Sequence, residues 1–310
     1  MNTFSILHGD AIEQLRTLPD KSVHCVVTSP PYWGLRDYGH AGQIGLEQTP
    51  DEYVGRLVAV FTEVRRVLRD DGTCFLNLGD SYASDTKGSG GPSEKQLSNA
   101  GSRYEMTQRL IHGLKPKDLV GIPWRVAFAL QADGWWLRQD IIWHKPNPMP
   151  ESVRDRCTKA HEYVFLLTKS ARYFYDAVAV AEKALQPEGE AKQVAQHKQI
   201  ALRRRDNMQS STLGTNQGAD TRNKRSVWSI TTQPYAGAHF ATMPPELAET
   251  CIRAGCPVGG TVLDPFCGSG TTLAVAIANG RNGIGVELNA EYIALAMDRI
   301  TGTQPALIGW

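Results

Sequence analysis

The sequence predicts an α/β protein built on an open, mostly parallel sheet. Apolar segments rich in β-branched residues alternate with helical segments along most of the 310 residues. Two of the apolar segments break off abruptly, residues 23–28 into Ser29-Pro30-Pro31-Tyr32 and residues 261–264 into a glycine-containing turn. Because ligands bind beyond the carboxyl ends of strands in open α/β sheets, both breaks are candidate parts of a functional site.

The composition is that of a soluble globular protein. Hydrophobic residues make up 41% of the chain and charged residues 21%, and no apolar run approaches the roughly 20 residues that a membrane helix needs. Asp10 and Glu13 interrupt the only candidate signal segment, so we expect a cytoplasmic protein. The net charge is +1, and any affinity for nucleic acid must therefore come from local clusters. No metal site is predicted.

The amino-terminal segment begins with a strand and a helix. Residues 4–9 are expected to form a short strand, and residues 11–18 follow with helical spacing of their apolar side chains. Asp10 lies between them, where its side chain could simply cap the helix. The next strand, residues 23–28, contains three valines and must end at the double proline, since proline removes backbone donors from the ladder.

A helix and a strand with well-marked boundaries follow. Thr49-Pro50-Asp51-Glu52 supplies an N-cap, a proline and two carboxylates for the first turn of a helix at about residues 50–69. Asp70-Asp71-Gly72 is expected to end that helix, and residues 73–78 to form a buried strand. Residues 77–82 then lie at the sheet edge that carries the double proline, either as part of the site or as an ordinary turn.

The middle of the chain contains an insertion, a helix and two strands. Residues 84–114 lose periodicity and include a glycine- and serine-rich stretch, which is typical of a flexible insertion; a DNA-contacting arm is the alternative interpretation. A helix is expected at about residues 117–133, and strands at residues 135–143 and 162–168. The link between these two strands is rich in proline and basic side chains.

The last part of the chain combines strands, a glycine turn and an acid. Its expected elements are a helix at about 244–254, a strand at 261–264, a helix at 273–279, a strand at 282–286 ending at Glu287, and a helix at 290–300. This order is expected of a Rossmann-like half that binds an adenosine cofactor. A P-loop is excluded because Gly268-Ser269-Gly270-Thr271-Thr272 lacks the lysine of a phosphate cradle, whereas the turn alone does not exclude a nicotinamide dinucleotide.

Together the two strand-end motifs resemble those of the β-group of amino-directed DNA methyltransferases. Ser29-Pro30-Pro31-Tyr32 fits the family's [SND]-P-P-[YF] motif, and Phe266-Cys267-Gly268-Ser269-Gly270 fits its F-x-G-x-G motif, in the same order along the chain. The resemblance covers roughly residues 4–80, 118–176 and 226–300. No cysteine follows a proline, so the Pro-Cys nucleophile of the C5-cytosine methyltransferases is missing.

The resemblance implies a fold and a domain organisation. The fold is that of the Rossmann-like methyltransferases that use S-adenosylmethionine (SAM), with a mostly parallel seven-stranded sheet, helices on both faces and a circularly permuted motif order. Residues 1–177 and 226–310 would form the catalytic and SAM-binding domain, and residues 178–225 an inserted target-recognition region.

The resemblance also implies the cofactor and the residues that bind it. The cofactor is SAM, and a strand-terminal acid such as Glu287 suits a ribose diol. The glycines would let the backbone approach the methionine moiety, while Phe266 would supply an apolar wall. The expected cofactor-binding residues are Asp10, Asp264, Phe266, Gly268, Gly270, Thr271, Thr272 and Glu287.

The expected catalytic residues are Ser29, Pro30, Pro31 and Tyr32. An exocyclic amino nitrogen is a poor nucleophile because its lone pair is delocalised into the ring. In the family, the Ser29 hydroxyl and the Pro30 carbonyl would accept its hydrogens, and Tyr32 would stack on the flipped base. Serine in the first position is usual among N4-cytosine enzymes, so cytosine N4 is favoured over adenine N6.

The expected partner is double-stranded DNA, contacted by basic side chains in two segments. These residues are Arg154, Arg156, Lys159, Arg203, Arg204, Arg205, Arg222, Lys224 and Arg225. Solvated surface is the competing interpretation of both segments. A cognate restriction endonuclease is a further candidate partner, and either a monomer or a homodimer is compatible with the family.

Two rival functions remain open at this point. RNA and protein-amide methyltransferases use similar N-P-P-Y motifs, but they usually place the glycine motif first. A DNA-binding protein that keeps the fold without turnover is the rival of another class, which the intact motif residues disfavour.

Overall fold

The computed structural model describes residues 2–35, 37, 39–40, 42–83, 113–184, 221–232 and 243–302. The chain divides into two compact units, Met1–Asp176 with Ser226–Trp310, and Ala177–Arg225. In the smaller unit, strands β6 (Glu182–Lys183) and β7 (Thr221–Arg222) pair antiparallel. The predicted insertion at 84–114 falls mostly outside the described residues, as do Arg203, Arg204 and Arg205.

The larger unit contains a single mixed sheet. Its strands are β1 (Phe4–His8), β2 (Val23–Thr28), β3 (Leu68–Leu78), β4 (Trp136–His144), β5 (His161–Thr168), β8 (Val227–Ser229), β9 (Thr261–Asp264) and β10 (Asn282–Glu287). They lie in the order β1-β10-β9-β2-β3-β5-β4-β8. All neighbours pair parallel except β5, which is antiparallel to both β3 and β4. The prediction of an open, mostly parallel sheet is confirmed.

The predicted number of seven strands is wrong, because the described part of the chain contributes eight to this sheet. The additional strand is β8, which pairs with β4 through Ile142, Trp143 and His144. It is three residues long, too short to show a period in the sequence.

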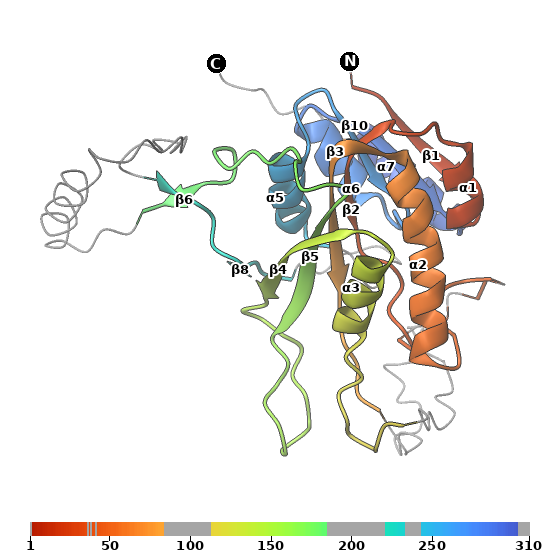
Figure 1. Ribbon diagram of the computed structural model, residues 1–310, viewed down its shortest axis with the longest axis vertical. Helices are drawn as coiled ribbons and strands as arrows, with labels where there is room; N and C mark the ends of the chain where they lie inside the picture. Colours follow the sequence, from red (N-terminus) through yellow and green to blue (C-terminus); the bar gives the residue numbers. More distant parts are fainter. Residues whose placement is uncertain are drawn as a thin grey trace, which may run out of the picture. The chain divides into compact units, whose positions relative to one another are not determined.

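Helices cover both faces of the sheet (Figure 1). They are α1 (Ala11–Thr17), α2 (Pro50–Val67), α3 (Ile122–Ala132), α5 (Pro245–Gly255), α6 (Thr271–Ala278) and α7 (Ala290–Thr301). Helices α1, α2 and α3 form one row, and α5, α6 and α7 form the other. No helix in the described ranges is long and apolar enough to cross a membrane.

The predicted starts of α1 and α2 are confirmed by their caps. The Asp10 carboxylate accepts hydrogen bonds from the backbone N–H groups of Ile12 and Glu13 at 2.9 and 3.1 Å. Thr49 and Glu52 form a reciprocal capping box at the start of α2. Both caps satisfy donors that the first helical turn leaves unpaired.

Two predicted boundaries are wrong for local reasons. Helix α3 begins at Ile122 instead of about Lys117, because Gly121 adopts a left-handed φ of 77° and Leu119 bridges to Tyr82. Strand β3 begins at Leu68, which pairs with Val23 across an irregular register. Asp70-Asp71-Gly72 therefore lies within a strand, and tertiary pairing has overridden its turn propensity.

Glycine 285 lets strand β10 approach the turn that precedes α6. A Cβ at this position would lie 2.8 Å from Cys267 Sγ and 3.0 Å from Leu273 Cδ2. At Gly55, an exposed position inside α2, an added Cβ would meet nothing within 4 Å.

These two glycines give a matched test of the packing. We expect Gly285→Ala to lower the free energy of unfolding by about 1–3 kcal/mol through overpacking. Gly55→Ala should raise it by about 0.5–1 kcal/mol, because alanine is the better helix former. Urea denaturation of both variants measures the difference, and equal effects would contradict the close approach.

Candidate active site

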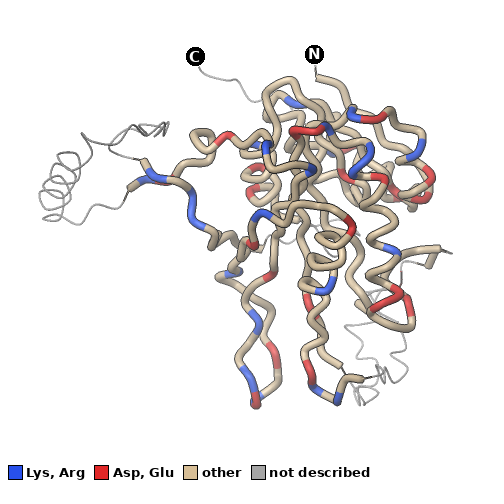
Figure 2. Tube along the Cα trace, in the orientation of Figure 1, with Lys and Arg blue, Asp and Glu red and all other residues tan. Residues whose placement is uncertain are grey.

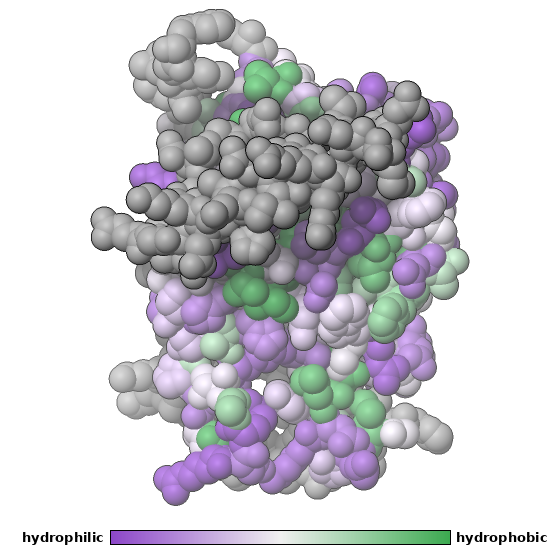
Figure 3. Space-filling view, turned by 60° about the vertical axis from the view of Figure 1, so that its left-hand side comes forward, coloured by the Kyte–Doolittle hydropathy of each residue, from purple (hydrophilic) through white to green (hydrophobic). Residues whose placement is uncertain are grey.

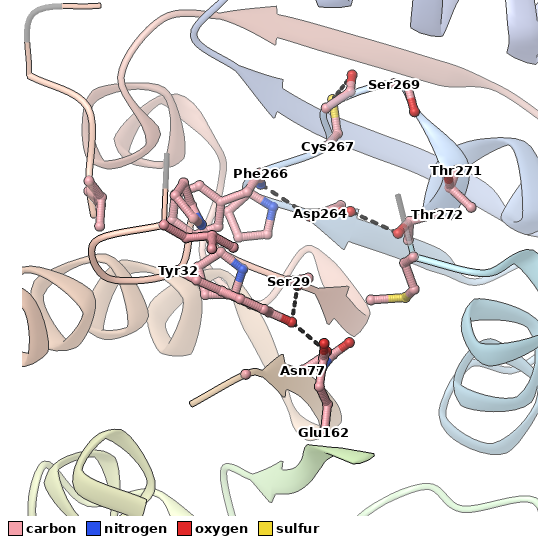
Figure 4. Close-up of a pocket in the computed structure, with 18 of the residues that line it drawn as sticks. Ser29, Tyr32, Asn77, Glu162, Asp264, Phe266, Cys267, Ser269, Thr271 and Thr272 are labelled. Carbon is pink, nitrogen blue, oxygen red and sulfur yellow. Dashed lines mark hydrogen bonds between the residues drawn. The ribbon is translucent and has the colours of Figure 1, made fainter. Parts of the chain in front are cut away.

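A cavity of about 930 Å³ opens at the carboxyl edge of the parallel strands. Strands β1, β2, β9 and β10 each end at its wall, as do β3 and β4, and β5 begins there. Its wall includes these predicted residues: Asp10, Ser29, Pro30, Pro31, Tyr32, Lys159, Asp264, Phe266, Gly268, Thr271, Thr272 and Glu287. The fold therefore brings the catalytic and cofactor motifs to one cavity, as Figure 4 shows for some of these side chains.

The glycine turn connects β9 to α6 by a tight path. Gly268 and Gly270 adopt left-handed φ values of 50° and 76°, which favour glycine. A Cβ at Gly270 would also lie 2.8 Å from the Ala296 Cβ, so Gly270 packs against α7 behind the turn. The turn thus brings backbone close to the cavity at Gly268.

Asp264 anchors this turn through three hydrogen bonds. Its side chain accepts from Thr28 Oγ1 and Thr272 Oγ1, each at 2.7 Å, and from the Phe266 backbone N–H at 3.1 Å. Burial raises the pKa of this carboxyl to about 6, although all three donors favour the ionised form. Asp264 and Thr272 were predicted to bind the cofactor, and the structure shows their polar atoms engaged within the protein.

Glu287 ends β10 on the opposite side of the turn. One of its carboxylate oxygens accepts from the Gly268 N–H at 2.9 Å and the other from the Asn289 N–H at 2.8 Å. Burial raises its pKa, and these backbone donors oppose the rise. Each oxygen keeps acceptor capacity beyond these two bonds.

Asp10 caps α1 and also lies on the cavity wall, so capping the helix does not remove it from the cavity. Both capping bonds use the same oxygen, Oδ1. Thr271, at the start of α6, accepts a hydrogen bond from Arg299 of α7 at 2.7 Å.

The Ser29-Pro30-Pro31-Tyr32 segment leaves β2 at the floor of the cavity. Ser29 Oγ and Tyr32 Oη are 3.3 Å apart, and the Pro31 carbonyl accepts from Tyr53 Oη of α2 at 2.9 Å. Tyr32 Oη donates to Glu162 Oε2 at 2.6 Å (Figure 4). Burial and the Glu162 charge raise the Tyr32 pKa well above its ordinary value, so the phenol stays protonated.

Sequence reasoning missed Glu162 as a site residue. Its carboxylate also accepts from Asn77 Nδ2 at 2.9 Å and forms an ion pair with Lys145. The available signal was the charged residue Glu162 near the start of β5, a strand that is apolar from Val164 to Leu167. Asn77 lies in the segment predicted to reach this edge, and it lines the cavity.

The basic link between β4 and β5 projects from the same edge (Figure 2). Figure 3 shows hydrophilic side chains gathered at the lower end of the described face, the end where Figure 1 places this link. Arg154 is exposed, and Lys159 lies on the cavity wall, where burial lowers its pKa. Arg156 instead pairs with Glu151 and lies over the Tyr82 ring at 4.0 Å.

In the smaller unit, the two predicted DNA-contacting arginines among the described residues, Arg222 and Arg225, are engaged locally. Arg225 and Arg222 both pair with Glu182, at 3.0 and 3.8 Å. Arg225 accordingly lowers the Glu182 pKa to about 2. Lys224 lies beside them and is partly buried.

Comparison with known proteins shows a family covering nearly the whole chain. The family described as "DNA methylase", N6_N4_Mtase, matches residues 23–298. Type II methyltransferase M.XycI of Xanthomonas campestris pv. cyanopsidis is 49% identical, with 98% of this chain and 90% of that protein covered. Type II methyltransferase M.SmaI of Serratia marcescens is 47% identical, with 97% and 91% covered.

Solved structures share the fold. PvuII DNA methyltransferase (cytosine-N4-specific) superimposes with a TM-score of 0.64 at 21% identity, covering 96% of this chain and 86% of that one. M1.HpyAVI, solved as a complex with SAM, has a TM-score of 0.55 at 17% identity, covering 96% and 99%. The predicted Rossmann-like methyltransferase fold is confirmed.

The raised pKa of Asp264 makes stability depend on pH with a defined sign. The unfolded chain loses this proton near pH 4, whereas the folded protein keeps it until about pH 6. The folded state binds more protons in this window, so the free energy of unfolding should fall as pH rises, by up to roughly 3 kcal/mol.

The variant Asp264→Asn isolates this contribution because it cannot titrate. We expect the stability of the wild type relative to Asp264→Asn to decline between pH 4 and pH 6 and then to level off. Urea denaturation of both proteins across pH 4–7 provides the measurement. A constant difference across this range would contradict the raised pKa.

Proposed function

Because this chain belongs to the N6/N4 DNA methylase family, we propose that it methylates cytosine N4 in double-stranded DNA, with SAM as the methyl donor. Family membership makes it a DNA methyltransferase that acts on an exocyclic amino group. The choice of base is our proposal, and adenine N6 is the alternative. The proposed enzyme is site-specific and would act at one DNA sequence.

The observation that carries the proposal is one cavity shared by two motifs. Ser29, at the end of β2, and the turn between β9 and α6 both form its wall. A base amino group held at Ser29 and an adenosine cofactor held by Glu287 and the turn can therefore meet. Such positioning supplies most of the rate enhancement in a direct displacement.

The glycine turn and the strand ends beside it provide residues that fit SAM. Glu287 can accept both hydroxyl hydrogens of a ribose, Asp10 lies at the neighbouring strand end, and Phe266 provides an apolar surface. Gly268 leaves room for the backbone to approach the ligand. When bound, SAM supplies an electrophilic methyl group on its sulfonium.

The chain's own residues prepare the acceptor nitrogen. Ser29 Oγ and the Pro30 carbonyl would accept the two amino hydrogens, which localises the nitrogen lone pair. The base must leave the duplex to reach the cavity, and the Tyr32 ring on the wall would stack against it. Hydrogen bonding to Glu162 holds that ring in place.

The neutral Ser29 side chain supports cytosine as the target. Serine at this motif position is the form usual among N4-cytosine enzymes, and a neutral hydroxyl is compatible with the N3 acceptor beside the cytosine amino group. The intact Ser29 also disfavours the catalytically silent alternative, because its proposed role at the amino group serves only methyl transfer.

The basic link between β4 and β5 is our candidate for contact with the DNA backbone near the flipped base. Arg154 is exposed there and Lys159 reaches the cavity. Residues 178–225 remain the proposed target-recognition region. Arg222 and Arg225 pair with Glu182, so they would have to share their charge between that acid and phosphate.

Product analysis tests the proposed reaction. Purified enzyme is incubated with SAM and unmethylated DNA of diverse sequence, and the digested nucleosides are identified by mass spectrometry. We expect N4-methylcytosine, and we expect Ser29→Ala to lower the transfer rate by about 10²-fold. N6-methyladenine would overturn the base assignment, whereas SAM binding without either product would favour the silent DNA-binding protein.

Glu287 provides a separate test of the cofactor site. Glu287→Gln should weaken SAM binding at least about tenfold, because it removes a charged acceptor. Isothermal titration calorimetry measures the dissociation constant, and Glu291→Gln, which alters an exposed acid of α7, is the control. Unchanged affinity in Glu287→Gln would contradict the assigned role.

A further inference from the structure

A short chain of hydrogen bonds leads from Ser29 to a carboxylate. Ser29 Oγ lies 3.3 Å from Tyr32 Oη, which lies 2.6 Å from Glu162 Oε2. All three residues line the cavity (Figure 4).

Chemistry fixes the direction of this chain. An ionised carboxylate only accepts hydrogen bonds, so the hydrogen of Tyr32 Oη must point to Glu162. The Tyr32 oxygen can then only accept in its contact with Ser29, so the single hydrogen of Ser29 Oγ is directed to Tyr32. Ser29 is left with lone pairs alone for any other partner.

The surroundings hold Glu162 in place through an ion pair and a hydrogen bond. Lys145 forms an ion pair with its Oε1, and the two side chains are 19% and 14% exposed. Asn77, which is 2% exposed, donates to Oε2 at 2.9 Å and contacts the Tyr163 carbonyl at 3.3 Å. Lys145 is itself held 4.4 Å from the centre of the Trp143 ring. Lys145 and Asn77 both donate to Glu162, so neither can reverse the direction of these hydrogen bonds.

We propose that Glu162 is a positioning residue for methyl transfer. By accepting the Tyr32 hydrogen, it orients the Ser29 hydroxyl so that Ser29 can only accept a hydrogen bond from the target amino group. This inference rests on the proposed role of Ser29 at the target amino group. A serine free to rotate could donate to the amino nitrogen and occupy the lone pair that must attack the methyl group. An aspartate at position 29 would need no such control, because a carboxylate cannot donate.

Two variants interrupt the series of hydrogen bonds from Ser29 to Glu162 at different positions. Glu162→Gln is nearly isosteric but introduces an N–H₂ donor that can reverse the direction, and Tyr32→Phe keeps the ring while removing the link. We expect each to lower the single-turnover methylation rate about tenfold or more, the equivalent of one lost hydrogen bond. Dissociation constants for SAM and DNA should change less than threefold, on the order of ordinary context effects.

The double variant separates positioning from general structural support. If Glu162 acts through Tyr32, Tyr32→Phe/Glu162→Gln should be no slower than the slower single variant. The control is Glu63→Gln, which removes a carboxylate paired with Arg66 on α2, away from the cavity, and should leave the rate unchanged.

Several outcomes would overturn the inference. Wild-type rates in either single variant would do so, as would losses that multiply in the double variant. A rate loss matched by an equal loss in SAM affinity and melting temperature would assign Glu162 a structural role only. If Glu162→Gln does not fold, Tyr32→Phe decides alone, since it keeps the ring. Absence of methyl transfer by the wild type would instead reject the proposed function, a result distinct from all of these.

Discussion

The buried carboxyl group of Asp264 connects the two halves of the site. It binds Thr28, the last residue of β2, and Thr272 in α6, and it lies 236 positions from Thr28 in the sequence. Ser29 follows Thr28 directly, so the same bonds that shape the cofactor turn also fix where the catalytic segment begins. The pKa of about 6 indicates that burial outweighs three hydrogen bonds at this group. The protein thus keeps a destabilising ionisable group at the point where its two motifs meet.

Much of the architecture follows from patterns that are local in sequence. Proline at position 30 ends a strand whatever surrounds it, and Asp10 and Thr49 cap helices within their own turn. Parallel pairing then brings the strand-end motifs together, because strands that run in the same direction end at the same edge of the sheet. This is why Ser29 and Glu287 could be assigned to one site from the sequence, although they lie far apart in it.

The remaining features depend on pairings that no local pattern encodes. Glu162 reaches Tyr32 only because β5 runs antiparallel between β3 and β4, with Tyr163 opposite Leu78 and His161 opposite His144. The positive charge of Arg156 suggested DNA contact. Its ion pair with Glu151 depends on the conformation of the loop, which the sequence pattern does not specify. Thr272 was likewise expected to bind the cofactor, and only the structure shows that its hydroxyl donates to Asp264.

The location of negative charge in the cavity links these observations to the proposed chemistry. A methyl acceptor needs hydrogen-bond acceptors around its amino group, and a carboxylate is the strongest of these, but beside cytosine it would face the N3 lone pair. Here the carboxylate of Glu162 stands two hydrogen bonds away from Ser29, paired with Lys145. Glu162 therefore acts on the base by orienting the Ser29 hydroxyl through Tyr32, and its charge does not contact the base. On this view, serine can replace an acid at the first motif position because its direction is set elsewhere in the sheet.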